Sequence, residues 1–379
     1  MRFDDHRPLP FVPGRVDPWT AVLPCLLAFW GVVMVYSATV VTGAEALSNH
    51  YLAKQLLFSL AGVVAMVVVT RIDYRKLGKP RFVYLLLFAT VALLVLVHIE
   101  PFGARRGGAS RWIDLGFTSF QPSELAKAVV VIFLASSVAR KGEEKMSTWR
   151  FGIAPHLLIP GVVVGLFMTQ PDFGSTAILC LIIGVMLYVG GARISHLVLL
   201  AAPALVGAAA AIITAPYRLK RILAFWNPWA DPRGSGYQVI ESLVAVGSGG
   251  VWGRGLGDGR QKLKYLPEIH TDFIFSNIAE EAGLIGVAIT MVLFAILVIR
   301  GMRIARRAPD PFGRYLAWGV SSLLGLEIVL NLGVVMSLLP TKGLALPFLS
   351  YGGTSVVISF MLVGLLLSVS RWSEPESAR

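Results

Sequence analysis

The sequence predicts an all-α polytopic membrane protein of about ten transmembrane helices. Of its 379 residues, 55% are hydrophobic and only 15% are charged, and the mean hydropathy is +0.70. A soluble globule of this size could not hide so much apolar side chain. The second observation is a series of long apolar runs flanked by charged, proline or aromatic residues, because a helix needs about 20 mainly apolar residues to cross the hydrocarbon core.

The expected spans follow one another along the whole chain. They cover residues 19–41, 52–70, 82–99, 122–139, 153–169, 174–192, 194–215, 272–299, 313–338 and 348–370. The fifth to seventh are short or closely joined at Gly190 to Arg193, so one of them could be a re-entrant segment. The first run is too long for a signal-peptide core and lacks a small-residue cleavage site, which predicts a retained anchor.

Basic residues gather in alternate loops between the spans. They are Arg71, Arg75, Lys76, Lys79 and Arg81, then Arg140, Lys141, Lys145 and Arg150, then Arg300, Arg303, Arg306, Arg307 and Arg314. The positive-inside rule places these loops in the cytoplasm. With ten helices, the transmembrane domain (19–370) then lies between a short cytoplasmic N-terminus (1–18) and a cytoplasmic tail (371–379).

The longest loop, residues 216–271 between the seventh and eighth helices, falls outside the cytoplasm and is itself basic. Its charged residues are Arg218, Lys220, Arg221, Arg233, Arg254, Arg260, Lys262 and Lys264 against Asp231, Glu241, Asp258 and Glu268. Long loops translocate largely regardless of charge, which would explain this without function. The alternative is an anion site for phosphate or pyrophosphate, which Arg105, Arg106 and Arg111 in the second outside loop would strengthen. Within the long loop, residues 235–247 predict a short interfacial helix.

Ionisable side chains inside the predicted spans are expensive, on the order of 2.5–3.5 kcal/mol each at a helix centre. Glu124 and Lys127 are three residues apart and can pair on one helix face. They are either a self-neutralising structural pair or a charge lining a cavity. Glu327 and Asn331 share a face in the ninth span, where we expect packing between helices.

Asp272 opens the eighth span directly after the basic loop. It could be an ordinary N-cap, as we expect for Asp172 at the start of the sixth span. Alternatively, its carboxylate lies at the water–lipid boundary beside cationic groups and accepts a proton from a substrate hydroxyl. Glu280 and Glu281 lie about two turns deeper, and the sequence does not separate their roles.

Familiar nucleotide and metal motifs are absent from the sequence. Gly253, Gly255, Gly257 and Gly259 lack the strand and helix of a dinucleotide-binding loop, so we expect them to provide flexibility. Residues 340–343 lack P-loop spacing, and no His/Cys cluster has zinc spacing. The pattern predicts no nucleic-acid partner.

The polar segments resemble those of the SEDS family (shape, elongation, division and sporulation). The similar segments are residues 108–116, 121–127, 170–174, 227–232 with 236–238, 266–275 with Glu280 and Glu281, and 339–343 with 347–353. Together they span essentially the whole membrane domain. Residues 261–267 and 340–343 are more similar to the FtsW branch than to the RodA branch, and Thr354 stands where the family more often has serine.

The resemblance implies a peptidoglycan glycosyltransferase that polymerises lipid II on the outer face of the bacterial cytoplasmic membrane, at the division septum. The implied partners are a class B penicillin-binding protein transpeptidase (FtsI-like), other divisome membrane proteins, and membrane lipid. The alternatives are a RodA-type elongation polymerase, a lipid II flippase or a non-catalytic divisome scaffold. Transporters usually place their sites near the midplane, whereas these polar motifs gather at one face.

The resemblance also implies roles for individual residues. Asp272 would be the general base that deprotonates the 4-hydroxyl of the acceptor sugar in an inverting transfer. Candidates for holding the pyrophosphates are Arg111, Lys127, Arg218, Arg221 and Lys342, with Glu124 orienting Lys127 or Arg111. Trp112 could pack against lipid or sugar. A divalent cation (Mg or Mn) could assist, but the sequence shows no ligand set for it.

Overall fold

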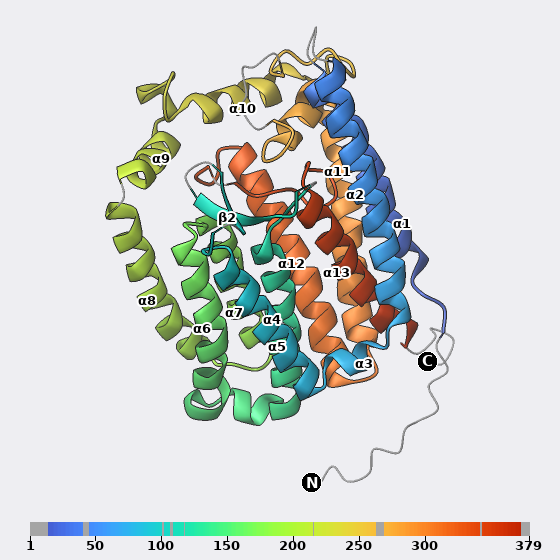
Figure 1. Cartoon of the computed structure of the whole chain (residues 1–379), viewed down its shortest axis with the longest axis vertical. Coiled ribbons are helices and arrows are strands. Elements are labelled where there is room, and N and C mark those ends of the chain that lie inside the picture. The colour runs from blue at the N-terminus through green and yellow to red at the C-terminus, as the bar shows by residue number, and fades with distance from the viewer. Residues whose placement is uncertain are drawn as a thin grey trace.

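The computed structural model describes residues 14–40, 45–100, 102–106, 109–116, 118–214, 216–262, 269–341 and 343–372. Long helices run side by side along the molecule, and a small sheet and two short helices lie toward one end, which we call the loop end (Figure 1). The two ends of the described chain meet at the opposite, terminal end, where the Gly14 N–H donates to the Arg371 carbonyl at 2.8 Å. Most of the predicted terminal segments (1–18 and 371–379) lie outside the described residues.

Within the described residues, ten long helices match the ten predicted spans. They are α1 (Pro18–Thr39), α2 (Glu45–Arg71), α4 (Pro80–Leu96), α5 (Pro122–Met146), α6 (Ala154–Thr169), α7 (Phe173–Val189), α8 (Ile194–Ile213), α11 (Ile274–Arg307), α12 (Pro311–Val335) and α13 (Gly353–Arg371). By length and composition, six of the described helices can cross a membrane: α1, α2, α5, α11, α12 and α13. The other four are shorter apolar helices. The polytopic helical fold is therefore confirmed, with α6, α7 and α8 as separate helices.

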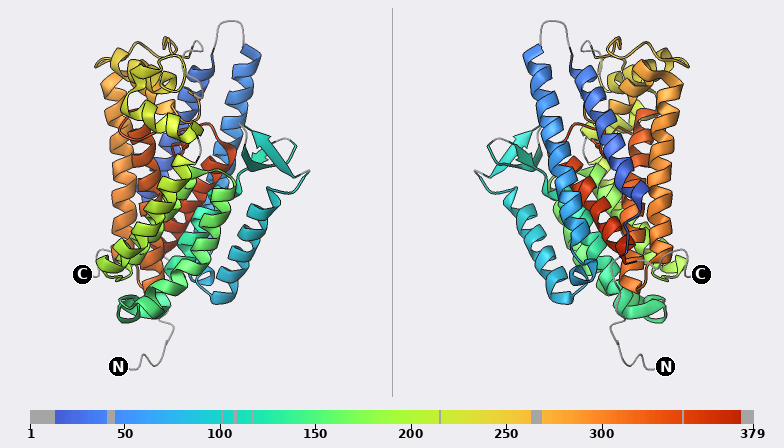
Figure 2. Two further views of the ribbon diagram at one scale, coloured as in Figure 1. Left: turned by 90° about the vertical axis from the view of Figure 1, so that its left-hand side faces the viewer. Right: turned by 90° about the vertical axis from the view of Figure 1, so that its right-hand side faces the viewer.

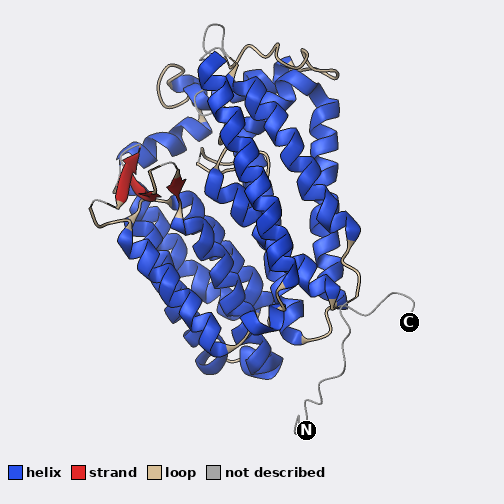
Figure 3. Ribbon diagram, turned by 45° about the vertical axis from the view of Figure 1, so that its right-hand side comes forward, coloured by secondary structure: helices blue, strands red, loops and turns tan. Residues whose placement is uncertain are grey.

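The shorter elements complete the connections between the long helices. They are α3 (Tyr74–Leu77), a π-helical turn (Trp149–Ile153), α9 (Pro216–Trp226), a 3₁₀ turn (Pro228–Ala230), α10 (Tyr237–Ser248), and the strands β1 (Gly103–Arg106), β2 (Ala109–Asp114) and β3 (Ser119–Phe120). Helix α10 confirms the short helix expected over 235–247. The antiparallel sheet, in the order β1-β2-β3, and helix α9 were not predicted, because their segments are too short and too polar to stand out (Figure 3).

The basic loops gather at the terminal end. The Arg75 guanidinium, in the α2–α4 connection, lies 4.9 Å from the Trp372 ring and 3.7 Å from Asp310 in the α11–α12 connection. Arg300 pairs with Asp17 at 3.2 Å beside the start of α1. Described parts of two basic segments and both chain ends thus share one end of the bundle, as the charge pattern predicts.

Two helices begin later than predicted. Helix α11 begins at Ile274 rather than 272, and its N-cap residue is Phe273, so Asp272 is not the cap. Helix α13 begins at Gly353 rather than 348, because residues 348–352 form a turn in which 348–350 are buried. Phe348 adopts a φ of +65° there and packs edge-on against Phe360, with ring centroids 5.2 Å apart. The apolar character of this segment reflects a buried turn, which hydropathy alone does not distinguish from a helix.

The helices differ sharply in how deeply they are buried. Helices α5 and α13 are enclosed by their neighbours, whereas α8 lies on the outside of the bundle with most of its side chains exposed (Figures 1 and 2). Helix α4 lies on another side, next to the sheet (Figure 2). Exposed apolar faces of this kind are expected where lipid surrounds a helix.

Candidate active site at the loop end of the bundle

Asp272 lies in the turn before α11 and is partly buried. The carbonyl oxygens of residues 270–272 each accept a hydrogen bond from α12 or from the turn before α13. The donors are the Tyr351 N–H to His270 (2.9 Å), the Ser350 hydroxyl to Thr271 (2.6 Å) and the Asn331 side-chain amide to Asp272 (3.0 Å). Three consecutive backbone groups are therefore fixed by segments about 60 to 80 residues away in sequence.

Asn331 joins Asp272 to a second segment. Its amide also donates to the Leu344 carbonyl at 2.5 Å, and the side chain is almost completely buried. Nearby, a Cβ added to Gly343 would lie 3.2 Å from Asp272 Oδ2, so this backbone approaches the carboxylate closely. The packing role expected of Asn331 is thus a specific contact to the aspartate. Lys342, a predicted pyrophosphate ligand, lies outside the described residues.

Three arginines come to the same region, one from β2 and two from α9. Arg111 on β2 donates from Nε to the Gln170 carbonyl at 3.0 Å, and it also bonds the Pro171 carbonyl. The Arg218 guanidinium lies 3.9 Å from the Phe173 ring centroid, and Arg221 donates to the Thr341 carbonyl at 3.4 Å. Arg111 is thus positioned by backbone carbonyls of the α6–α7 connection, and the alternative that Glu124 orients it is wrong.

A large cavity connects these groups with the interior of the bundle. Its volume is about 1360 Å³, and its walls are mainly apolar side chains of α6, α7 and α8. The charged residues that line it are Arg111, Asp172, Arg218, Arg221 and Asp272. Such a cavity can accept a long apolar chain at one end and an anionic head group at the other.

Lys127 forms a buried group of three charges away from this lining. Its ammonium lies 2.9 Å from Glu124 and 2.5 Å from Glu327 of α12, and Lys127 is only 3% exposed. The predicted Glu124–Lys127 pair is confirmed. Two carboxylates already neutralise the ammonium, and neither Lys127 nor Glu124 lines the cavity, so the structure does not bring them together with Asp272. Instead they tie α5 to α12, one turn from Asn331.

Two further predictions concern the neighbours of this site. Trp112 follows Arg111 on β2 and does not line the cavity. Asp172 is the N-cap of α7, as predicted, accepting the Ser175 N–H at 3.1 Å. Asp172 also lines the cavity.

Sequence reasoning missed the residues that hold Asp272 in place. Ser350 and Tyr351 lie in the segment 347–353 that carries the family resemblance, yet the prediction made it the start of a helix. The polar and glycine-rich residues 350–353 were the available indication that this segment forms a turn. Arg105 and Arg106 lie in β1, but their side chains lie outside the described part of the structure.

The fold and site together define a polytopic membrane protein with a carboxylate and several arginines at the mouth of an apolar cavity. Residues 19–374 match the model of the FtsW, RodA and SpoVE family, described as "Cell cycle protein". The chain belongs to this family, which confirms the resemblance to the SEDS proteins.

Individual relatives cover almost the whole chain. A protein of Geobacter sp. (strain M18) named "Probable peptidoglycan glycosyltransferase FtsW" is 43% identical over 93% of this chain and 96% of its own length. Stage V sporulation protein E of Bacillus subtilis (strain 168) is 43% identical over 94% of this chain and 97% of its own.

Solved structures show the same fold. A chain described under "Structural coordination of polymerization and crosslinking by a peptidoglycan synthase complex" is 31% identical, with a TM-score of 0.75, covering 94% of this chain and 98% of that one. The rod shape determining protein RodA of Thermus thermophilus is 28% identical, with a TM-score of 0.69, covering 95% and 98%. The arrangement of helices seen here is therefore shared with both structures.

Proposed function

We propose that this protein is a peptidoglycan glycosyltransferase that polymerises lipid II into glycan strands for septal wall synthesis. The observation that carries the proposal is the meeting of Asp272 and three arginines at the mouth of the apolar cavity. Relatives that are more than 40% identical over most of the chain are named as glycosyltransferases of the FtsW type. The loop end would face outward from the cytoplasmic membrane, because the basic loops lie at the terminal end.

Asp272 acts as the general base in the proposed reaction. Its carboxylate takes the proton from the 4-hydroxyl of the acceptor sugar as that oxygen bonds to the anomeric carbon of the donor. The bond from this carbon to pyrophosphate breaks, and its electron pair leaves with undecaprenyl pyrophosphate. The α-linked sugar becomes β-linked. One base is enough, because pyrophosphate is a good leaving group that needs neutralisation of charge rather than a proton.

The arginines provide that neutralisation. Arg111 of β2 and Arg218 and Arg221 of α9 line one cavity, so a pyrophosphate there would meet several cationic donors. The apolar walls formed by α6, α7 and α8 accept the polyprenyl chain. Lys342 stays a predicted ligand. Lys127 and Glu124 support the site through α12 rather than touching substrate.

A flippase is the second candidate function for such a membrane fold. Transport sites usually lie near the midplane between inverted repeats. The charged residues lining this cavity are concentrated where β2, α9 and the turn before α11 meet, which favours chemistry at one membrane face.

A transpeptidase partner follows from the peptidoglycan synthase complex whose chain shares this fold. We propose a class B penicillin-binding protein of the FtsI type at the division septum, with other divisome proteins nearby. Among the described residues, no three His, Cys, Asp or Glu side chains converge on a metal site. A divalent cation such as Mg²⁺ or Mn²⁺ that would assist the transfer stays a prediction.

The decisive experiment combines the purified protein, its transpeptidase partner and fluorescent lipid II, with the products resolved by size. We expect the wild type to make polymer and a folded Asp272→Ala variant to make none. Polymer from Asp272→Ala at the wild-type rate would overturn the assignment of the base. Movement of lipid II across vesicles without polymer would favour the flippase instead. A fluorescent fusion at the sidewall rather than the septum would point to an elongation role.

A further inference from the structure

Helix α11 is broken near its start, and a loop fills the break. Gly283 has a φ of +63° and a ψ of −163°, so the helical hydrogen bonds across it are missing. Residues 249–255 replace them. The Arg254 and Gly255 N–H groups donate to the carbonyls of Glu280 and Glu281 (3.0 and 3.1 Å), and the Leu284 and Ile285 N–H groups donate to Gly250 and Val251 (2.9 and 3.3 Å). The pairs 284–280 and 285–281 are the ones an unbroken helix would have bonded.

The glycines of this loop allow its backbone to lie close to the backbone of α11. Gly253 has a φ of +80°, and a Cβ added to it would lie 2.1 Å from the Glu281 carbonyl oxygen. A Cβ on Gly249 would lie 1.8 Å from the Ala279 oxygen. The expectation that the glycine-rich run provides flexibility is therefore wrong, since this backbone is fitted into the helix.

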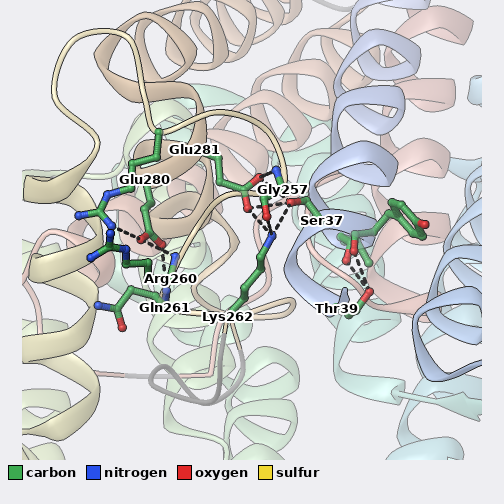
Figure 4. A network of polar contacts seen from close by, with 11 residues as sticks. Ser37, Thr39, Gly257, Arg260, Gln261, Lys262, Glu280 and Glu281 are labelled. Atoms are coloured by element: carbon green, nitrogen blue, oxygen red, sulfur yellow. Dashed lines mark hydrogen bonds and ion pairs between the residues drawn. The ribbon is translucent and has the colours of Figure 1, made fainter. Parts of the chain in front are cut away.

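Two adjacent buried glutamates fasten the same loop, and the structure separates their roles (Figure 4). Glu280 accepts the N–H groups of Arg260 (2.8 Å) and Gln261 (3.2 Å). Glu281 accepts the Gly257 N–H at 3.1 Å, the Lys262 ammonium at 3.1 Å and the Ser37 hydroxyl of α1 at 2.7 Å. Both glutamates are 1% exposed. Glu281 thus joins three separate parts of the chain.

We infer that Glu281 is a positioning residue for Asp272, an inference that rests on the proposed glycosyltransferase function. Because α11 is interrupted at Gly283, the segment 274–282 is not held by the rest of its helix. The inserted loop is bonded to this segment at Glu280 and Glu281. The backbone of residues 270–272, directly before the segment, is bonded to Asn331, Ser350 and Tyr351. Glu281 is the buried side chain that joins this segment both to the inserted loop and to Ser37 of α1.

Glu281→Gln tests this inference, because it keeps the size of the side chain and removes its charge. We expect kcat for lipid II polymerisation to fall about tenfold or more, with KM nearly unchanged, since a small displacement of a catalytic group is costly. Hydrogen exchange should quicken at the amides of residues 254–255 and 284–285. A role in folding alone would lower the amount of folded enzyme without changing its kcat or these exchange rates.

The matched control is Asp17→Asn at the other end of α1. It removes the ion pair to Arg300, also on α11, while an asparagine can still cap α1. Its kcat should stay within about twofold of wild type, as for a partly exposed ion pair. If Glu281→Gln does not fold, Ser37→Ala removes one hydrogen bond to the same carboxylate from outside the loop and should lower kcat in the same direction.

The outcomes separate this inference from the proposed function. If the wild type makes no polymer, the proposed function fails first. If the wild type polymerises and Asp272→Ala does not, but folded Glu281→Gln or Ser37→Ala has wild-type kcat and exchange, the positioning role is overturned.

Discussion

The two sides of the cavity mouth are built differently. On the Asp272 side, the carbonyls of residues 270–272 each accept a hydrogen bond, and Glu327, one helical turn from Asn331 on α12, pairs with the buried Lys127 of α5. On the opposite side, α8 exposes side chains such as Leu205 (68%), and α9 exposes Trp226 (79%). Proton transfer needs a fixed geometry, whereas a polyprenyl chain needs only apolar surface and room. In the proposed reaction, proton transfer belongs to the Asp272 side and the polyprenyl chain to the side of α8, with the pyrophosphate near Arg218 and Arg221 of α9.

The largest effect is expected on the Asp272 side, where Lys127→Ala should lower the stability of the folded protein. Removing the ammonium leaves the carboxylates of Glu124 and Glu327 close together without their positive partner. Breaking a buried pair in this way costs about 3–5 kcal/mol of folding free energy. Unfolding of the detergent-solubilised protein by heat or denaturant measures the loss of stability. Arg140→Ala, on the same helix toward the terminal end, is the control and should change stability much less. Equal losses for the two variants would contradict a special role for the buried group.

Asn331→Ala should have the next largest effect, and on turnover rather than on binding. Loss of the amide frees the Asp272 and Leu344 carbonyls, and we expect kcat to fall about tenfold to a hundredfold. Polymerisation kinetics with fluorescent lipid II measure it. Asn227→Ala, at the exposed end of α9, is the matched control. A rise in KM alone would instead place Asn331 among the binding groups.

A smaller effect is expected when the cavity is narrowed from the side of α8. Gly207 of α8 lines the cavity, and a Cβ there meets no described atom within 4 Å. Gly207→Leu should raise KM for long-chain lipid II about threefold to tenfold, because it takes room from the apolar tail. The KM for a lipid II analogue with a short polyprenyl chain should be the same as that of the wild type. Val206→Phe, exposed and outside the lining, is the control, and equal effects of both variants would argue against a tail in the cavity.

The smallest effect concerns Asp231, in the connection from α9 to α10. The Ser235 N–H and hydroxyl donate to its carboxylate and lower the pKa of Asp231 below its ordinary value. A carboxylate whose pKa is lowered by folding stabilises the turn at any pH above the ordinary pKa of aspartate. This stabilisation is lost as the pH falls through the lowered pKa of the folded state. Exchange of the Ser235 amide, corrected for its intrinsic rate, should therefore quicken in acid. Asp231→Asn should lack this pH dependence, and polymerisation at neutral pH should barely change.

Local patterns explain what could be predicted. Apolar runs located ten helices, because the requirement to span lipid acts on each segment separately. The spacing of Glu124 and Lys127 and the position of Asp172 before α7 revealed a pair and a cap, since both contacts lie within about one turn. Arg111, Arg218, Arg221 and Asp272 do line one cavity, although their roles in catalysis stay predictions.

The remaining features depend on contacts between distant segments. Lys127 was predicted to bind pyrophosphate, and its second carboxylate partner, Glu327, lies 200 residues away in the sequence. The run from Gly253 to Gly259 looked flexible until its fit into the break of α11 was seen.

The sequence by itself determined the membrane class, the helices, the family and the cluster of charge at one face. Only the tertiary structure decided which cations reach the cavity, that Asp272 is held by its backbone rather than capping a helix, and how Glu281 fastens the loop. The physical reason is range: hydropathy and charge act on single segments, whereas hydrogen bonds between segments depend on how the whole chain is packed.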